Sequence, residues 1–238
     1  MPPKPKFDRE EIIDAAFELA RREGIDAVKA REVGELLGCS SRPIFTFFDS
    51  IDRLKEEVTE KAWSFFWSRI DKASEYLPSF KKRGLLFIEF AKEEPKLFQL
   101  LFMTEKEQLD LKALIRNRSA GFEDDIAVIR RDYVTTEEEA ERLFAHLWIY
   151  SYGICVLCAT GICTFTEEEL SEMLGECFIG AVMEINREPD GGIAKLSPVK
   201  KTDTSSAFSS PAPIFRLLGR DDPDTDDADE ETPESKNR

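Results

Sequence analysis

Apolar side chains recur at intervals of three and four residues along most of positions 8–187, which is the spacing of one face of an α-helix. The first run lies within residues 12–20 and follows Asp8 and Glu11, whose spacing is that of a capping box. It predicts a helix that ends near Glu23. No segment alternates apolar and polar residues as a strand does. The pattern therefore predicts an all-α chain of about nine helices.

Residues 29–48 predict two short helices with a glycine-containing turn between them. The apolar stripe of the first helix consists of Val33, Leu36 and Leu37. Gly38 can adopt the left-handed conformation that ends this helix, and Ser40 can cap the next one. The buried side of the second helix consists of Ile44, Phe47 and Phe48. This arrangement is a helix-turn-helix.

In a helix-turn-helix, the first residues of the second helix reach base edges in the major groove of DNA. We therefore expect DNA contacts from that helix and from nearby polar and cationic residues. The expected contact residues are Lys29, Arg31, Ser40, Ser41, Arg42, Pro43, Phe45, Thr46, Phe47 and Lys55. Lys4, Lys6 and Arg53 could extend the same basic patch if the acids of the first helix face away from it.

A longer series of positions has a recognisable order and spacing. These positions are Ile12, Ile13, Ala15, Ala16, Gly24, Arg31, Glu32, Val33, Gly34, Gly38, Cys39, Ser40, Ile44, Phe45, Phe48, Ser50 and Leu54. The series resembles the DNA-binding domain of the TetR family of bacterial one-component repressors. The resemblance implies a three-helix DNA-binding domain over residues 1–50.

Three residues depart from the family's pattern. Phe45 stands where a tyrosine hydroxyl usually bonds a phosphate, and Ile51 stands where a lysine usually begins the fourth helix. Lys29 replaces a threonine, which loses a capping oxygen but offers a cation. The first sixty or so residues also hold slightly more acids than bases, whereas a DNA-binding domain usually has a basic face. A helix-turn-helix that is only structural is the alternative interpretation.

The chain as a whole carries 48 acidic and 33 basic residues, a formal net charge of -15. Much of this charge lies after Gly219, in a block of Asp and Glu that cannot fold by itself. Residues 188–238 are therefore expected to form a disordered acidic tail, either a solubilising appendage or a segment that competes with DNA for the basic patch. Within it, the apolar stretch 211–219 could dock on the folded body.

Residues 51–187 predict a second helical domain that begins with a long fourth helix, capped by Ser50 and ending near Pro78. Pro95 divides the following segment into two helices. The positions Phe90, Ala91, Pro95, Leu97 and Phe98, with Trp148, Tyr152 and Gly153, are similar to the ligand-binding domain of one TetR subgroup. That resemblance implies a helical ligand-binding and dimerisation domain, although a histidine of the subgroup's pattern is replaced.

Two further capping boxes open long helices, Thr136 with Glu139 and Thr166 with Glu169. These are the expected eighth and ninth helices. In the family the same pair packs against its copy in a second subunit, which implies a homodimer. A two-fold dimer would place two recognition helices about 34 to 36 Å apart, on successive major grooves of a palindromic operator.

Aromatic and sulfur-containing side chains at helical spacing are the candidate walls of an effector pocket. The candidates are Phe87, Phe90, Phe98, Leu101, Phe102, Met103, Phe144, Trp148 and Tyr152. Such walls favour a small apolar or aromatic effector, because a buried charge would need a partner. Plain core packing of the same residues is the competing interpretation.

The sequence gives little support for redox sensing, metal binding or catalysis. Cys155, Cys158 and Cys163 could suit a redox sensor or a soft metal, but buried cysteines more often fill a core. With one histidine, His146, no nucleophile elbow and no phosphate loop, we expect no enzyme, no cofactor and no metal. No secretory or membrane-spanning segment is expected, so the protein should be cytoplasmic.

These observations predict a DNA-binding transcriptional regulator that acts as a repressor. It would bind a palindromic operator as a dimer, and a small apolar or aromatic effector would release it. The alternative is a helical binding or scaffold protein of the same fold that has lost operator binding.

Overall fold

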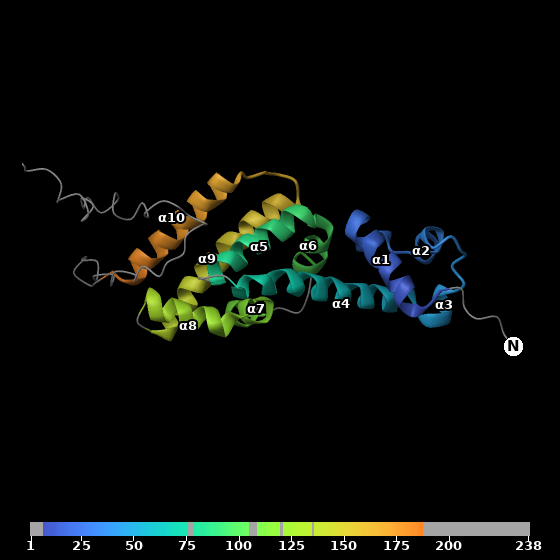
Figure 1. Ribbon diagram of the computed structural model, residues 1–238, viewed down its shortest axis with the longest axis horizontal. Helices are drawn as coiled ribbons and strands as arrows, with labels where there is room; N and C mark the ends of the chain where they lie inside the picture. The colour runs from blue at the N-terminus through green and yellow to red at the C-terminus, as the bar shows by residue number, and fades with distance from the viewer. Residues whose placement is uncertain (1–6, 76–78, 105–108, 120, 135, 188–238) are drawn as a thin grey trace, which may run out of the picture. The chain divides into compact units, whose positions relative to one another are not determined.

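The computed structural model describes residues 7–75, 79–104, 109–119, 121–134 and 136–187, all of which belong to one compact unit within Met1–Val199 (Figure 1). The elements of these residues are ten α-helices and two short 3₁₀ helices. The predicted all-α fold is confirmed. The expected acidic tail lies outside the described residues.

The N-terminal helices are α1 (Arg9–Glu23), α2 (Ala30–Leu36) and α3 (Ile44–Phe47), with a 3₁₀ turn at Ile25–Ala27. The capping box of α1 is present as predicted, with the Asp8 carboxylate accepting from the backbone N–H of Glu11 at 2.9 Å. Helix α1 ends at Gly24, whose φ of 97° is a left-handed value that suits glycine.

Helix α4 (Ile51–Ile70) begins as predicted, because the Ser50 hydroxyl accepts from the backbone N–H of Arg53 at 3.1 Å. The prediction that it runs nearly to Pro78 is wrong. The α-helical hydrogen bonds stop at Ile70, and a 3₁₀ helix, Asp71–Glu75, follows. Such a tightening is common at the carboxyl end of a helix.

Pro95 separates α5 (Ser79–Glu93) from α6 (Pro95–Phe102), as predicted. Two short helices then follow, α7 (Leu111–Arg118) and α8 (Phe122–Asp132). We expect only one helix in this interval from the sequence. The expected eighth and ninth helices are therefore α9 (Glu137–Ala159) and α10 (Glu167–Ile185). Both of their capping boxes are present.

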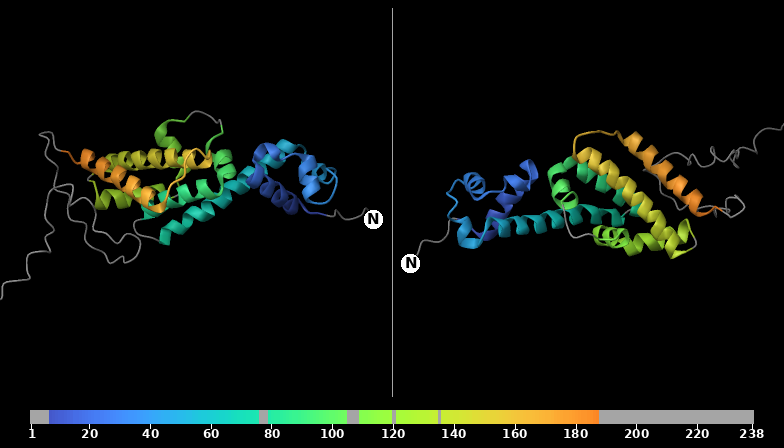
Figure 2. Two further views of the ribbon diagram at one scale, coloured as in Figure 1. Left: turned by 90° about the horizontal axis from the view of Figure 1, so that it is seen from above. Right: turned by 180° about the vertical axis from the view of Figure 1, so that it is seen from behind.

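The helices pack around two hydrophobic clusters. The larger cluster takes residues from α1 to α6 and from the second half of α9, so it runs through both predicted folded domains. The smaller cluster joins α7, α8, the first half of α9 and α10. Helix α9 lies between α5 and α10, as Figures 1 and 2 show. The proposed boundary at residue 50 stays a prediction.

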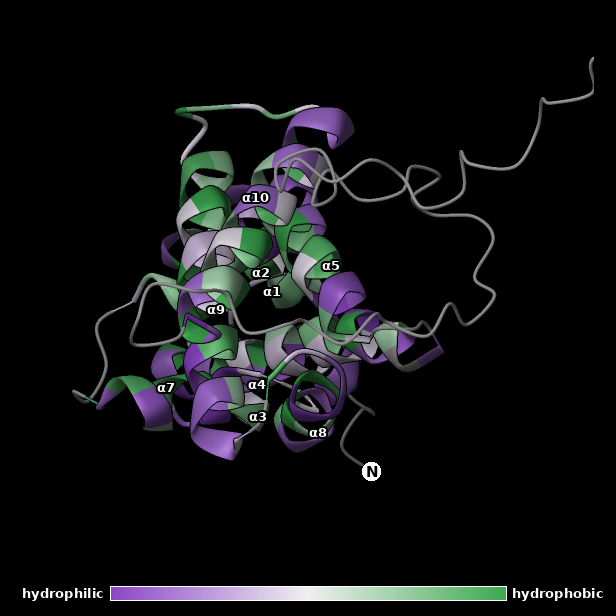
Figure 3. Cartoon of the chain, turned by 90° about the vertical axis from the view of Figure 1, so that its left-hand side faces the viewer, coloured by the Kyte–Doolittle hydropathy of each residue, from purple (hydrophilic) through white to green (hydrophobic). Residues whose placement is uncertain are grey.

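Much of helix α9 is apolar (Figure 3), and part of its apolar surface is exposed. Ile149 is 47% exposed and Leu157 is 37% exposed, and Gly153 lies between them at helical spacing. By length and composition α9 could cross a membrane, with a mean hydropathy of 1.3 over 18 residues, contrary to the expectation that the chain has no such run. One helix of this kind is weak evidence for a membrane protein, because core helices of soluble proteins can have the same length and composition.

Candidate DNA-binding interface

The turn between α2 and α3 depends on two glycines. Gly38 has a φ of 63°, the left-handed conformation that was predicted. Gly34 is buried, and a Cβ there would lie 3.0 Å from the Cys39 carbonyl oxygen and 3.1 Å from that of Ser40. Its backbone oxygen also accepts from the Cys39 N–H at 2.9 Å. Helix α2 and the turn are therefore in close backbone contact.

Helix α3 starts later than predicted. Its N-cap is Pro43, and Ser40 makes no capping bond, so that prediction is wrong. The Ile44 N–H bonds to the Ser41 carbonyl at 3.2 Å, and the Thr46 N–H bonds to the Pro43 carbonyl at 3.1 Å. These i to i+3 bonds make the entry a tight turn. Only the single turn Ile44–Phe47 is α-helical.

The core side of the helix-turn-helix is mostly as expected. Val33, Ile44 and Phe48 are buried, with no more than 2% of each exposed. Leu36 departs from the expected stripe and is 46% exposed, because α2 ends at this residue and nothing covers it. The anchored Ile44 and Phe48 fix the orientation of the residues between them.

The outer side carries the predicted contact residues. Arg42, Phe45 and Thr46 are exposed, and the Phe45 ring is exposed to 55%. Lys29, Arg31 and Ser40 are exposed as well. The remaining expected contacts, which are only partly exposed, are Ser41, Pro43, Phe47 and Lys55. We call Arg42, Phe45 and Thr46 the recognition surface.

The cations around this surface differ in their pairing. Arg31 donates to Glu35 on its own helix at 2.9 Å, and Arg53 donates to Glu56 at 2.5 Å. Among the described residues, no acid pairs with Lys29, Arg42 or Lys55. Exposed ion pairs stabilise a protein only weakly. DNA phosphates can therefore compete for Arg31 and Arg53.

The acids of α1 are engaged elsewhere. Lys61 of α4 donates to Glu10 at 3.1 Å and also to Asp14. These contacts turn the acids toward α4. Glu10 and Asp14 are therefore paired with α4 and are not part of the recognition surface.

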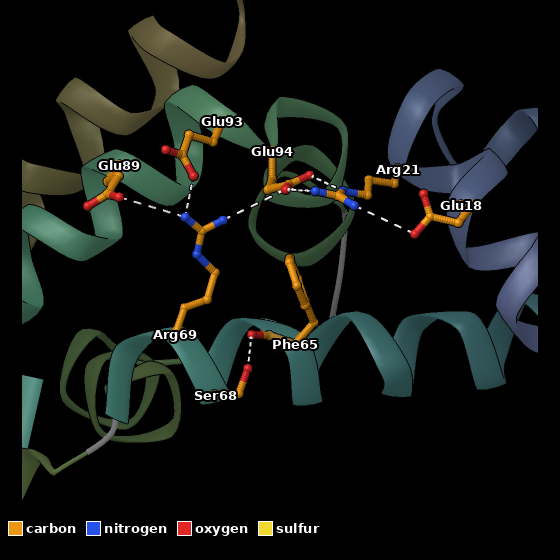
Figure 4. Close-up of polar contacts among 8 residues, drawn as sticks. All are labelled: Glu18, Arg21, Phe65, Ser68, Arg69, Glu89, Glu93 and Glu94. Atoms are coloured by element: carbon orange, nitrogen blue, oxygen red, sulfur yellow. Dashed lines mark hydrogen bonds and ion pairs between the residues drawn. The ribbon is translucent and has the colours of Figure 1, made fainter. Parts of the chain in front are cut away.

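A partly buried ion pair joins α1 to the helices of the second predicted domain (Figure 4). Arg21 of α1 donates from Nε and Nη2 to the two carboxylate oxygens of Glu94, at 2.7 and 2.5 Å. Glu94 is only 4% exposed and precedes Pro95 at the start of α6. Arg69 of α4 lies 3.7 Å from the same carboxylate and also pairs with Glu93. We call Arg21, Arg69 and Glu94 the linking cluster.

The candidate effector-pocket residues lie in both hydrophobic clusters. Phe87, Phe90, Phe98 and Leu101 are buried in the larger cluster, with Phe102 and Tyr152 packed against it. Phe144 and Trp148 border the smaller cluster, and Met103 is 41% exposed. The Tyr152 hydroxyl donates to the Phe102 carbonyl at 2.8 Å. The aromatic rings also pack against one another. The ring centroids of Phe87 and Phe102, for example, are 5.1 Å apart.

A groove near these residues has other walls. It is a groove of about 290 Å³ lined by Trp63, Trp67, Leu109, Asn117 and Arg118. A second groove, of about 550 Å³, runs between α1 and α4 and is lined mainly by charged residues. The sequence pattern gave no signal for Arg118, because its place beside Trp63 joins segments far apart in the chain.

The cysteines show the features of packed thiols. Cys155 is buried, and desolvation raises its pKa well above the ordinary value. Desolvation also raises the pKa of Cys158. No group of three His, Cys, Asp or Glu side chains in the described part of the chain is placed to hold a metal. His146 is exposed on α9.

Comparison with known proteins identifies the N-terminal part. The family model described as bacterial regulatory proteins, tetR family, matches residues 12–58, from α1 into α4. No curated protein and no solved structure matches the chain. The matched segment contains the helix-turn-helix, its recognition surface and the first residues of α4. The N-terminal domain of this chain is thus that of the tetR family, and the protein is a DNA-binding transcriptional regulator.

Proposed function

We propose that the protein is a cytoplasmic, ligand-responsive repressor that binds a palindromic operator as a homodimer. The observation that carries the proposal is the recognition surface, in which Arg42, Phe45 and Thr46 face solvent while Ile44 and Phe48 anchor the helix. An arginine there can bond a guanine edge, and an exposed ring can contact a thymine methyl. Lys29 and Lys55, which have no acidic partner among the described residues, suit the DNA backbone.

The outer side of α9 and α10 supports the dimer. Ile149, Gly153 and Leu157 form an exposed stripe on α9, and Gly180 is exposed on α10. An uncovered stripe of this kind suits a self-complementary, two-fold interface. A dimer through α9 and α10 would bring together two copies of the recognition surface.

The linking cluster supports a ligand response. Because Glu94 bonds Arg21 in the DNA-binding domain and precedes α6, a change in the packing of α6 acts directly on α1. A small apolar or aromatic effector would favour packings in which the two recognition surfaces no longer match the operator. To change the occupancy of the operator from nearly full to nearly empty, the effector must bind the state that does not bind DNA more tightly by about 5.5 kcal/mol.

The test is selection of bound duplexes from a random pool, followed by binding of the selected site at several salt concentrations. We expect a two-fold symmetric sequence bound by two protomers, with affinity that falls steeply as salt rises. Sedimentation of the free protein should show a dimer. A monomeric protein, or one that selects no sequence at low salt, would overturn the proposal.

One set of observations favours a second candidate, a helical binding protein that has lost operator binding. Arg31 and Arg53 are paired with acids of their own helices, and Phe45 lacks the hydroxyl that the family uses on a phosphate. This candidate predicts a dimer that selects no sequence in the same experiment.

A further inference from the structure

The groove beside α4 combines aromatic walls with a cation. Trp63 and Trp67 stack at 5.5 Å between ring centroids on one side of α4. Arg118, at the end of α7, lies with its guanidinium 4.5 Å from the Trp63 ring centroid. Leu109 and Asn117 complete the lining, and Leu109 is 42% exposed at the rim.

Arg118 is held in place but not neutralised. Its Nη1 donates to the Leu101 carbonyl at 3.1 Å, near the end of α6, which fixes the direction of the side chain. No acid among the described residues lies within ion-pair distance of it. Partial burial lowers its pKa, because desolvation disfavours the charged guanidinium.

We propose that this groove binds a small aromatic carboxylate, with the rings against Trp63 and Trp67 and the carboxylate on Arg118. An arginine offers a planar fork of donors that matches a carboxylate, and most of its donors have no bond to the described chain. A volume of about 290 Å³ is at the lower end for ligand pockets, which limits the ligand to one or two rings.

This inference rests on the proposed function, because it names the class of effector to which the regulator would respond. The groove is made by α4 and α7, and Arg118 bonds the last turn of α6. A carboxylate on the other donors of Arg118 adds a contact to a side chain that already bonds the Leu101 carbonyl. Binding therefore changes contacts of both α4 and α6, the two helices that also carry or adjoin the linking cluster.

The experiment uses 2-naphthoate and its neutral amide, 2-naphthamide, as probes. The chain has three tryptophans, so the Trp148→Phe protein reports only Trp63 and Trp67 by fluorescence. We expect naphthoate to quench their emission and to bind about tenfold more tightly than naphthamide, a difference of about 1.4 kcal/mol. Arg118→Gln should remove this preference, and Arg118→Lys should retain part of it.

The matched control is Arg130→Gln, an exposed arginine of α8 that does not line the groove. A second control, Glu105→Gln with Glu107→Gln, removes acids of a segment outside the described residues, and the preference for naphthoate should persist. Equal affinity for the acid and the amide, or a preference that survives in Arg118→Gln, would overturn the inference.

The two proposals can fail separately. Operator binding and dimerisation are measured without any probe, so their failure leaves the groove's preference for an aromatic carboxylate standing. Naphthoate binding through Arg118 that leaves the operator fully occupied would overturn the effector role. Release of the operator by naphthoate, and not by naphthamide, supports it.

Discussion

Arg21 and Glu94 are 73 positions apart in the sequence, yet two parallel hydrogen bonds join their side chains. The pair connects a helix of the tetR-family domain to the junction of α5 and α6 (Figure 4). Glu94 is nearly inaccessible to water, whereas the Arg21 side chain is 38% exposed. The carboxylate therefore depends on its arginine partners for compensation of its buried charge.

Glu94→Gln should lower the free energy of unfolding by about 1 to 2 kcal/mol. A hydrogen bond to a charged group contributes about 1.5 to 3 kcal/mol, and the exposure of Arg21 reduces this value. Urea denaturation measures the change. The matched control is Glu89→Gln, whose carboxylate is 48% exposed and 3.8 Å from Arg69 and should change stability by less than about 0.5 kcal/mol. Equal effects of the two substitutions would contradict the view that the ion pair of Glu94 stabilises the fold.

Arg42→Gln should weaken binding to the selected duplex by about 1 to 3 kcal/mol if the guanidinium bonds a base edge. It should also relax selectivity at one position in each half-site. Fluorescence anisotropy against duplexes that carry single base changes measures both effects. Arg130→Gln on α8 is the control and should bind normally. A loss that is the same for every duplex would instead assign Arg42 to a phosphate.

Phe45→Tyr should strengthen DNA binding by about 1 kcal/mol, roughly fivefold, because the added hydroxyl can donate to a phosphate as it does in the family. The ring is 55% exposed, so the substitution should leave the thermal midpoint of unfolding unchanged. Anisotropy titration and thermal denaturation check the two statements. Unaltered affinity would show that the Phe45 ring edge does not face the DNA backbone.

Ile149→Glu should convert the dimer into monomers, because a two-fold interface would bring both copies of the new carboxylate into an apolar contact. Sedimentation velocity measures the association state. Leu111→Glu is a closely matched control, since Leu111 is exposed to the same 47% but lies on α7. A dimer that persists in Ile149→Glu would place the interface elsewhere.

Cys155 should react slowly with iodoacetamide at pH 7.5. Desolvation raises the pKa of its thiol, so the reactive thiolate is scarcer there than on an ordinary cysteine, and becomes abundant only at higher pH. Mass spectrometry of the alkylated protein, with a guanidinium-unfolded sample as reference, gives the ratio of rates. Rapid labelling of folded protein would restore the redox-sensor interpretation.

Features set by neighbouring residues could be predicted from the sequence. The capping boxes of α1, α9 and α10, the break at Pro95 and the positive φ of Gly38 each depend on a few adjacent positions. The start of α3 could not be predicted in this way, because Ser41 and Pro43 form a tight turn in place of a helix capped by Ser40.

Some features of the candidate sites could likewise be predicted from the sequence, and others could not. The exposed residues of α3 follow from helical spacing once Ile44 is buried. The bond between Arg21 and Glu94 and the position of Arg118 over Trp63 join segments far apart in the chain, and only the tertiary packing brings them together. A periodicity of apolar residues also cannot separate a pocket wall from a core residue, as the burial of Phe90 and Phe98 illustrates.

The exposed apolar side of α9 would also affect the survival of a newly synthesised subunit. In the proposed dimer this side is covered by the second subunit, so an unpaired subunit with Ile149 and Leu157 facing water would be prone to bind other apolar surfaces. The rate of pairing depends on the square of the subunit concentration. A regulator present at low concentration would therefore remain unpaired for longest. For such a dimer, loss of unpaired subunits to chaperones and proteases would set a lower limit on its cellular copy number.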